Sequence, residues 1–424
     1  MNYYLAVDIG ASSGRHIVGW REGEEIITRE VYRFPNDFTK INESLTWDLD
    51  AIVSHVKAGI DEALKLFPTI KSLSVNTWGV DYVLMNGDEE ILPSYAYRDS
   101  RTEKVIDEVH GLIPLEEIYA RTGIQYIPFN TIYQLFADKL AGRLEHATDF
   151  LMMPEYFLYK LCGSKSHEYT EATTTELVNA FTEQYDMEIV KALGLPERLF
   201  PEISKPGKII GKYKGINCVL CASHDTASAV EAIPMNGNEI YISSGTWSLL
   251  GVTLKAPITT LESLRADYTN EGGVNCICFH KNIMGMWLIN SLRNELCPGK
   301  NFAEIVHEAE ASNFDLTVDA NDSAFLSPQS MKAAFDSILY EIPQSPADYF
   351  RCAYRSLAST YAKSVEELER LTGKTYKHIY IVGGGAKNKF LNSLTEQATH
   401  KEVIALPIEA TALGNIKLQM EIDS

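Results

Sequence analysis

The sequence predicts an α/β fold made of two related domains, and three features of the chain support this prediction. Short runs of β-branched and aromatic residues alternate with stretches of helical period. Residues 239–254 repeat the pattern of residues 3–20, which is a strand, a turn rich in serine and glycine, and a second strand. The chain has 424 residues, enough for two or three domains of about 150 residues each.

The first predicted domain covers residues 1–233 and begins with strands. Residues 3–34 alternate β-rich runs with polar turns, a pattern typical of an antiparallel meander. From Asp50 to Phe67 apolar residues recur every three or four positions, which predicts an amphipathic helix that ends at Pro68. Residues 72–85 favour a strand, a break at a Trp-Gly pair and another strand. We therefore expect the element order βββαβ.

Helical spacing dominates from about Asp99 to Phe200 and predicts a helical insertion in this first domain. Strand character returns after Gly215 in the run NCVLCASHDTASAVEAI, which favours a strand, a polar junction and a helix of small residues. The domain boundary is expected in the segment PMNGNE, residues 234–239.

The second predicted domain covers residues 239–424 and is also α/β. After the repeated strand-turn-strand unit, residues 354–371 have the spacing of an amphipathic helix. The run HIYIVGGG then predicts a buried strand that ends in three glycines, and a further helix runs through Phe390 and Leu394.

Composition and charge restrict the kind of partner. Hydrophobic residues make up 45% and charged residues 22% of the chain, as in ordinary globular proteins. The formal net charge of −19 disfavours binding to nucleic acid or to an anionic membrane. The N-terminus lacks the pattern of a signal peptide, and the 7 cysteines are scattered, so we expect reduced thiols in the cytoplasm. We also expect a monomer or homodimer.

Two turns have the composition of phosphate-binding loops, DIGASSGR at Asp8–Arg15 and SSGTWS at Ser243–Ser248. In a third, VGGG at Val382–Gly385, the glycines would let a flat base or ribose lie against the backbone. Small residues let backbone amides converge on a phosphate, and Asp8 at a strand end suits Mg²⁺ or its water. Ordinary hairpin turns have the same composition, so that alternative stays open. Neither a dinucleotide fingerprint nor a P-loop is present.

A fourth candidate is SHDT, residues 223–226, at the strand-to-helix junction. A carboxylate fixed at a helix start can accept a hydroxyl proton, although Asp225 could equally cap the helix. TWGVD at residues 77–81 and YRDSR at residues 97–101 suit sugar recognition or surface ion pairs. The cysteine pairs Cys218/Cys221 and Cys276/Cys278 fit buried thiols better than a zinc site.

Taken together, these motifs resemble the FGGY carbohydrate kinases of the actin, Hsp70 and sugar kinase superfamily, most closely the rhamnulokinase branch. The resemblance runs in order from Leu5 to about Ile416 through AVDIGASSGR, TWDLD, NTWGVDYVL, AYRDSRT, GIQYIPFNTIYQL, MMPEYF, EYTEATTT, ASHDTASAV, SSGTWSL, TNEGG, KNIMGMWL, IVGGGAKN and EATALGNI. It implies two RNase H-like domains of the actin-like ATPase type with a cleft between them, and the helical insertion in the first.

The resemblance also implies a reaction and its residues. Asp225 would be the base that deprotonates the C1 hydroxyl of L-rhamnulose, with ATP as phosphoryl donor and L-rhamnulose 1-phosphate and ADP as products. The implied nucleotide and metal residues are Ser13, Gly14, Arg15, Thr246, Asn290, Gly384 and Gly385 for ATP, and Asp8 for Mg²⁺. The implied sugar contacts are Trp78, Gly79, His224, Asp225, Thr226 and Asn282.

The chain departs from the family pattern in two places. Asn290 stands where close relatives can carry Gln, and a shorter amide needs a water bridge to reach the same group. The family usually continues past the EATALGN helix, so a C-terminal stretch is expected to be absent. The alternatives left open are a kinase for another ketose, such as L-fuculose or L-xylulose, and a nucleotide or sugar sensor of the same fold without catalysis.

Overall fold

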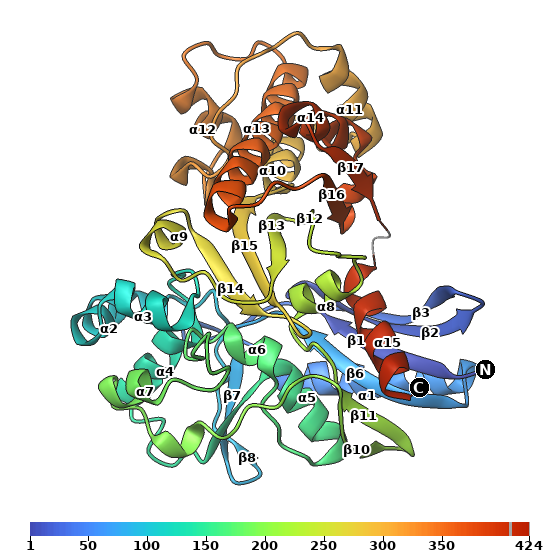
Figure 1. Ribbon diagram of the computed structural model, residues 1–424, viewed down its shortest axis with the longest axis vertical. Helices are drawn as coiled ribbons and strands as arrows, with labels where there is room; N and C mark the ends of the chain where they lie inside the picture. Colours follow the sequence, from blue (N-terminus) through green and yellow to red (C-terminus); the bar gives the residue numbers. More distant parts are fainter. Residues whose placement is uncertain (407–408, 424) are drawn as a thin grey trace. The chain divides into compact units, whose positions relative to one another are not determined.

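The computed structural model describes residues 1–406 and 409–423, which form two compact units (Figure 1). Unit 1 consists of Met1–Pro234, Thr253–Phe279 and Ala410–Ser424, and unit 2 consists of Met235–Val252 and His280–Glu409. Two later segments of the chain therefore pack with its first part. In one of them, the backbone carbonyl of Tyr268 accepts a hydrogen bond of 2.7 Å from the Tyr119 hydroxyl.

The main sheet of unit 1 has six strands in the order β10-β11-β6-β1-β2-β3. Their bounds are β1 (Tyr3–Ile9), β2 (Ser13–Glu22), β3 (Glu25–Pro35), β6 (Ile70–Thr77), β10 (Lys208–Tyr213) and β11 (Ile216–Leu220). β1, β2 and β3 pair antiparallel, which confirms the predicted meander, and β6 and β11 continue the sheet in parallel. The register places Asp8 of β1 opposite Arg15 of β2.

Helix α1 (Leu49–Leu66) confirms the helix predicted from apolar spacing. The Asp48 side chain caps its first turn by accepting a hydrogen bond from the backbone N–H of Ala51. The buried face includes Ile52, Val56 and Ile60, which join the core beneath the sheet. A hairpin of β4 (Thr39–Ile41) and β5 (Ser44–Thr46) precedes the helix.

The predicted strand, break and strand are β6 and β7 (Tyr82–Asn86), separated by residues 78–81. β7 pairs with β8 (Glu89–Glu90) and with β9 (Asp149–Met152), and β9 is a strand inside the region expected to be helical. The helices of that region are α2 (Ile106–Leu112), α3 (Leu115–Thr122), α4 (Thr131–Leu140), α5 (Met153–Cys162), α6 (Tyr169–Thr173) and α7 (Met187–Ala192), with 3-10 turns at Ser100–Lys104 and Glu197–Leu199. α5 packs into the core of the main sheet, and the other helices contribute to a second buried core.

Unit 1 is completed by segments from far along the chain. They are α8 (Asp225–Glu231), α9 (Leu261–Arg265), β14 (Tyr268–Gly272) and α15 (Ala410–Asp423). Figure 1 shows the red C-terminal helix α15 beside α8 and β1, and its residues Ile416 and Met420 share a core with Tyr4 and Ile17.

The second sheet has the order β14-β15-β13-β12-β16-β17. Its remaining strands are β12 (Glu239–Ser244), β13 (Trp247–Leu254), β15 (Ile277–Met284), β16 (His378–Val382) and β17 (Glu402–Ala405). β12 pairs antiparallel with β13 and parallel with β16, as β1 pairs with β2 and β6. This correspondence confirms the internal repeat that the sequence predicts.

The helices of unit 2 are α10 (Trp287–Leu296), α11 (Phe302–Ala311), α12 (Met331–Ile338), α13 (Pro346–Thr372) and α14 (Lys389–Thr399), with 3-10 turns at Ser323–Phe325 and Gly384–Lys387. α13 begins before its predicted start because Ser345 and Asp348 form a capping box around Pro346. Apolar spacing alone does not mark this start, since the capping residues are polar.

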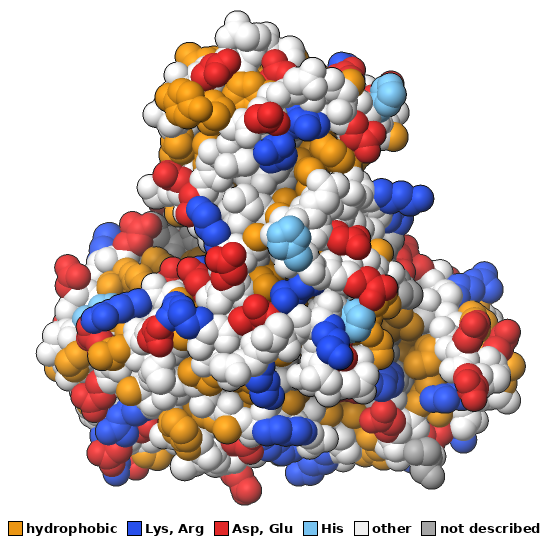
Figure 2. Space-filling model, turned by 45° about the horizontal axis from the view of Figure 1, so that its top comes forward, with side chains coloured by type: hydrophobic (Ala, Val, Ile, Leu, Met, Phe, Trp, Pro, Cys, Tyr) orange, Lys and Arg blue, Asp and Glu red, His pale blue; other side chains and the backbone are white. Residues whose placement is uncertain are grey.

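No helix within residues 1–406 and 409–423 is long and apolar enough to cross a membrane. In the same part of the chain all seven cysteines are free thiols. On the face drawn in Figure 2, acidic and basic side chains are interspersed among apolar ones.

Candidate active site

The first predicted phosphate turn connects β1 to β2 in unit 1. The backbone N–H of Gly10 donates to the Ser13 carbonyl at 2.9 Å and closes the turn. Gly14 is buried under the ring of Phe34, and a Cβ at this position would overlap that ring. The glycine is therefore required by packing within the sheet, independently of any ligand.

Asp8 and Arg15 form an ion pair beside this turn. Nε and Nη2 of Arg15 both lie 2.9 Å from Oδ2 of Asp8. Burial raises the pKa of Asp8, the charge of Arg15 lowers it, and the charge of Asp225 raises it. Asp8 of β1 lies opposite Asn76 of β6, and the next residue, Thr77, pairs with His224 beside Asp225. Unit 1 thus brings the predicted metal residue and the predicted base into one region.

The break between β6 and β7 is a strained turn at residues 78–81. Val80 has φ +68°, a backbone conformation that a β-branched side chain rarely adopts. Thr174 Oγ1 accepts a hydrogen bond of 3.0 Å from the backbone N–H of Val80, and the carbonyl of Val80 accepts from Thr131 Oγ1 at 2.7 Å. Strain of this kind persists only where neighbours fix the conformation, and it concentrates at functional sites.

The turn presents Trp78, whose indole is fixed by the buried carboxylate of Asp81. Oδ2 of Asp81 accepts from Nε1 of Trp78 at 3.0 Å and from Nε1 of Trp47 at 2.7 Å. The two indole rings lie 4.3 Å apart between centroids. Burial raises the pKa of Asp81 to about 6, partly offset by these hydrogen bonds and one from Gln134. Asp81 therefore orients Trp78, one of the predicted sugar contacts.

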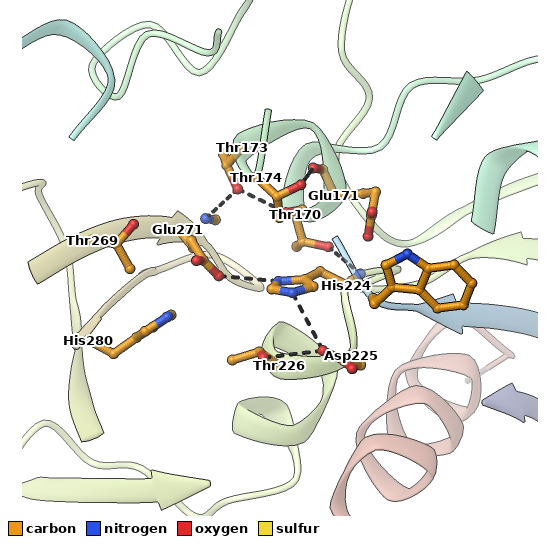
Figure 3. Close-up of polar contacts among 12 residues, drawn as sticks. Thr170, Glu171, Thr173, Thr174, His224, Asp225, Thr226, Thr269, Glu271 and His280 are labelled. Carbon is orange, nitrogen blue, oxygen red and sulfur yellow. Dashed lines mark hydrogen bonds and ion pairs between the residues drawn. The ribbon is translucent and has the colours of Figure 1, made fainter. Parts of the chain in front are cut away.

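The junction between β11 and α8 carries His224, Asp225 and Thr226 (Figure 3). Its backbone is anchored on both sides. Thr77 N–H donates to the Ser223 carbonyl at 3.0 Å, and His224 N–H donates to Thr170 Oγ1 at 3.2 Å. These bonds connect the junction to β6 and to α6, the helix of the motif EYTEATTT.

Asp225 is the first residue of α8, and the N-cap position is His224, whose side chain makes no capping hydrogen bond. The Asp225 side chain is 37% exposed, and Oδ1 accepts a hydrogen bond of 3.2 Å from Thr226 Oγ1. Partial burial raises the pKa of Asp225, while His224 and Thr226 lower it. The result is an accessible carboxylate whose basicity is above that of an ordinary aspartate.

The His224 ring lies between two carboxylates in Figure 3. Nε2 is 3.5 Å from Oδ1 of Asp225, and Nδ1 is 3.3 Å from Oε2 of Glu271 on β14. The sequence motif TNEGG contains Glu271, but nothing in its spacing assigns that residue to the site. Glu271 is thus a member of the candidate site that motif analysis missed.

Unit 2 contains the second group of predicted residues. The turn between β12 and β13 exposes Thr246 and Trp247, and Thr246 accepts a backbone hydrogen bond of 3.1 Å from Gly285. A Cβ on Gly385 would overlap the Ser244 hydroxyl, so the GGG turn packs directly on this hairpin. Gly384 of the GGG turn is exposed. The β12–β13 turn therefore contacts both the GGG turn and the backbone at Gly285.

Asn290 connects to the same turns, because its backbone N–H donates to Met286, whose N–H donates to Gly245 at 2.9 Å. Asn282 lies on β15, also in unit 2. Unit 1 thus groups Asp8, Ser13, Gly14, Arg15, Trp78, Gly79, His224, Asp225 and Thr226, and unit 2 groups Thr246, Asn282, Asn290, Gly384 and Gly385.

Two sheets with the same hairpin-and-parallel-strand core, each carrying one group of polar turn residues, define the two-domain α/β kinase fold of the actin-like ATPases. The chain belongs to the FGGY family of carbohydrate kinases: the N-terminal domain of that family matches residues 3–230 and the C-terminal domain matches residues 240–421. The predicted family and fold class are confirmed. The chain is a carbohydrate kinase, and this family membership implies the use of ATP.

The curated relatives include rhamnulokinases. That of Halalkalibacterium halodurans is 42% identical over 436 residues, covering 99% of this chain and 93% of that protein. The rhamnulokinase of Bacillus subtilis is 38% identical over 436 residues, covering 98% of this chain and 90% of that protein.

Solved structures show the same fold at low identity. Ligand-bound xylulose kinase from Lactobacillus acidophilus has a TM-score of 0.84 and 16% identity, covering 100% of this chain and 89% of that one. Glycerol kinase from Plasmodium falciparum with ADP has a TM-score of 0.80 and 16% identity, covering 99% of this chain and 89% of that one.

Proposed function

We propose that this carbohydrate kinase phosphorylates the C1 hydroxyl of L-rhamnulose, with ATP as donor, to give L-rhamnulose 1-phosphate and ADP. The proposed substrate is supported by relatives named rhamnulokinase that are 38% to 42% identical over nearly the whole chain. The observation that carries the chemistry is the accessible carboxylate of Asp225 at the start of α8, beside His224 and Thr226.

In the proposed step Asp225 accepts the proton of the C1 hydroxyl. The C1 oxygen forms a bond to the γ-phosphorus, the bond from that phosphorus to the β,γ-bridging oxygen breaks, and ADP leaves with the electron pair. The proton on Asp225 then passes to solvent. The raised pKa of Asp225 suits this role, because a base works best when its pKa is not far below the working pH.

Asp8 fits the proposed Mg²⁺ site. Carboxylate oxygens are the ligands that Mg²⁺ prefers, and because both Arg15 contacts go to Oδ2, the other oxygen is left for the metal or its water. When bound, Mg²⁺ would neutralise charge on the phosphates. The proposed nucleotide contacts are Ser13, Gly14 and Arg15, with Thr246, Asn290, Gly384 and Gly385. The proposed sugar contacts are Trp78, Gly79, His224, Thr226 and Asn282.

The test is Asp225→Asn, which keeps the size of the side chain and removes the base. We expect sugar-dependent ADP release with L-rhamnulose to fall by about 10² to 10⁴. Asp107→Asn on the exposed face of α2 is the matched control and should retain wild-type turnover.

A panel of L-rhamnulose, L-fuculose, L-xylulose and glycerol tests the substrate. Faster turnover with another ketose would replace the proposed substrate. Turnover that survives in folded Asp225→Asn protein would overturn the proposed base, and no release with any sugar would overturn the proposed reaction.

A further inference from the structure

Glu271 lies behind the proposed base and is held there by its own strand. On one side of it, Gly272 N–H donates to Thr173 Oγ1 at 2.8 Å; on the other, Asn270 Nδ2 donates to the carbonyl of Gly123 at 3.0 Å. Both neighbours of Glu271 are therefore fixed to the helical insertion. The strand has little freedom to move the carboxylate away from His224.

His224 is equally restrained. Its backbone N–H is bound to Thr170, and its ring is sandwiched between Glu271 and Asp225 (Figure 3). The side chains of His224 and Glu271 are 10% and 14% exposed, whereas that of Asp225 is 37% exposed. A substrate hydroxyl can therefore reach Asp225 more readily than Glu271, and any effect of Glu271 on the substrate passes through the imidazole ring.

We propose that Glu271 is a positioning residue that holds His224 as an imidazolium, with Nδ1–H directed at Glu271 and Nε2–H directed at Asp225 and at a substrate hydroxyl beside it. The charged ring would then donate a hydrogen bond at the place where Asp225 takes up a proton. The role toward substrate rests on the proposed function, but the protonation of His224 does not.

The charges around His224 support this arrangement. Glu271 faces the ring from β14, Asp225 from α8, and Glu168 from the N-cap of α6. Burial alone would lower the pKa of His224, but the contact with Glu271 and the charges of Glu271, Asp225 and Glu168 raise it overall. The Glu168 carboxylate is already bound by the N–H groups of Thr170, Glu171 and Ser223, so Glu271 is the dedicated partner of Nδ1.

The direct test is an NMR titration of the full-length protein without ligand. The protein has 10 histidines, and His224→Gln identifies the resonance of His224 in ¹⁵N-histidine-labelled samples. We expect His224 in the wild type to titrate above about 6.5, and in Glu271→Gln at least about one pH unit lower, because an opposite charge at this distance shifts a pKa by about one to three units. Glu202→Gln, an exposed site, should leave it unchanged.

Two outcomes would overturn the proposal. One is a wild-type His224 that titrates below about 6.5, which needs no variant at all. The other is an unchanged titration in folded Glu271→Gln protein. Glu271→Asp keeps the charge on a shorter side chain and should retain a raised His224 pKa, so it supplies the comparison if Glu271→Gln does not fold.

Kinetics separate positioning from a merely structural role. Loss of the imidazolium should move the alkaline limb of the pH profile of kcat/KM to lower pH in Glu271→Gln. A structural defect would instead lower kcat/KM by the same factor at every pH, without a shift of the profile. If the wild type phosphorylates no ketose, the proposed function fails while the titration still decides the protonation of His224.

Discussion

At the scale of one residue, Glu171 is a buried carboxyl group on α6, the short helix that anchors the His224 backbone. Its side chain is buried on the short helix α6, and within the described part of the chain neither carboxylate oxygen has a hydrogen-bond partner. Burial raises its pKa well above the ordinary value, and the charges of Glu155, Glu168, Asp225 and Glu271 raise it further. The folded protein therefore favours the protonated form of Glu171 more strongly than the unfolded chain does.

Replacing this acid by its neutral isostere should make stability less dependent on pH. The folded protein binds a proton at Glu171 that the unfolded chain loses above about pH 4.5, so wild-type stability falls as pH rises from there toward the raised folded pKa. Glu171→Gln lacks this loss. It should gain up to about 1.4 kcal/mol over the wild type for each pH unit in that window.

Urea unfolding of both proteins at several pH values measures the difference. Glu202→Gln should follow the wild-type curve, since that side chain is exposed. A constant offset between Glu171→Gln and wild type across the window would show that Glu171 is ionised in the folded state.

At the scale of elements, the helix pair α8 and α15 positions the proposed base. Gly414 of α15 lies against α8 so closely that a Cβ there would overlap the Ser228 carbonyl. Ser228 Oγ donates to the Thr411 carbonyl at 2.8 Å, and Thr411 Oγ1 donates to the Asp225 carbonyl at 3.4 Å. The last helix of the chain thus touches the residue that begins α8.

Buried amides fix α15 on its other side. Asn415 Nδ2 donates to Oδ1 of Asn76 on β6, and Gln419 Nε2 donates to the Leu5 carbonyl at 3.0 Å. Ser72 Oγ in turn donates to Oε1 of Gln419. These bonds set the rotation and register of α15, because buried amide groups are costly when unpaired.

Gly414→Ala should therefore disturb both stability and catalysis. A methyl group forced against the backbone of α8 is expected to cost about 1 to 3 kcal/mol and to lower kcat by displacing Asp225. Gly111→Ala on α2 is the matched control: it meets no neighbour and should stabilise its helix by about 0.5 to 1 kcal/mol. Thermal unfolding and ADP release measure the two effects, and wild-type values for both in Gly414→Ala would contradict this view of the helix pair.

The elements that the sequence predicted best are those with one buried face, such as α1 and the β1–β3 meander. α15 lies within the predicted second domain, residues 239–424, and packs with unit 1, a contact that its sequence does not indicate. Both sides of α15 are covered, by α8 and by β1 with β6, and its buried residues include the polar Asn415 and Gln419 beside the apolar Ile416 and Met420, so no single apolar face marks the helix. Glu271 escaped prediction for a related reason, since a single carboxylate in a strand has no periodic signature and its partner is distant in sequence.

At the scale of the whole molecule, the proposed sugar contacts and the proposed nucleotide contacts predict that the two ligands protect different segments. L-rhamnulose alone should slow hydrogen exchange at residues 78–81 and at the start of α8, both in unit 1. ADP alone should slow exchange at residues 245–247 and 383–385, both in unit 2.

Mass-spectrometric hydrogen exchange of the free protein and of each binary complex measures this protection. Asp225→Asn should bind the sugar and show the same protected segments, because the variant loses the base and keeps the shape of the site. Protection of residues 383–385 by the sugar alone would contradict the assignment of these segments to the nucleotide.

The placement of α15 in unit 1 also has a consequence for how the chain folds as it is made. β1 and β6 emerge from the ribosome early, yet Oδ1 of Asn76 and the carbonyl of Leu5 also accept hydrogen bonds from Asn415 and Gln419, which are made much later. Unit 1 can collapse around its own strands during synthesis, but these hydrogen bonds form only after α15 has been made. Unit 1 therefore remains incomplete while unit 2 is being synthesised. A ribosome that stalls in the unit 2 segments leaves the apolar surface that α15 covers exposed to chaperones.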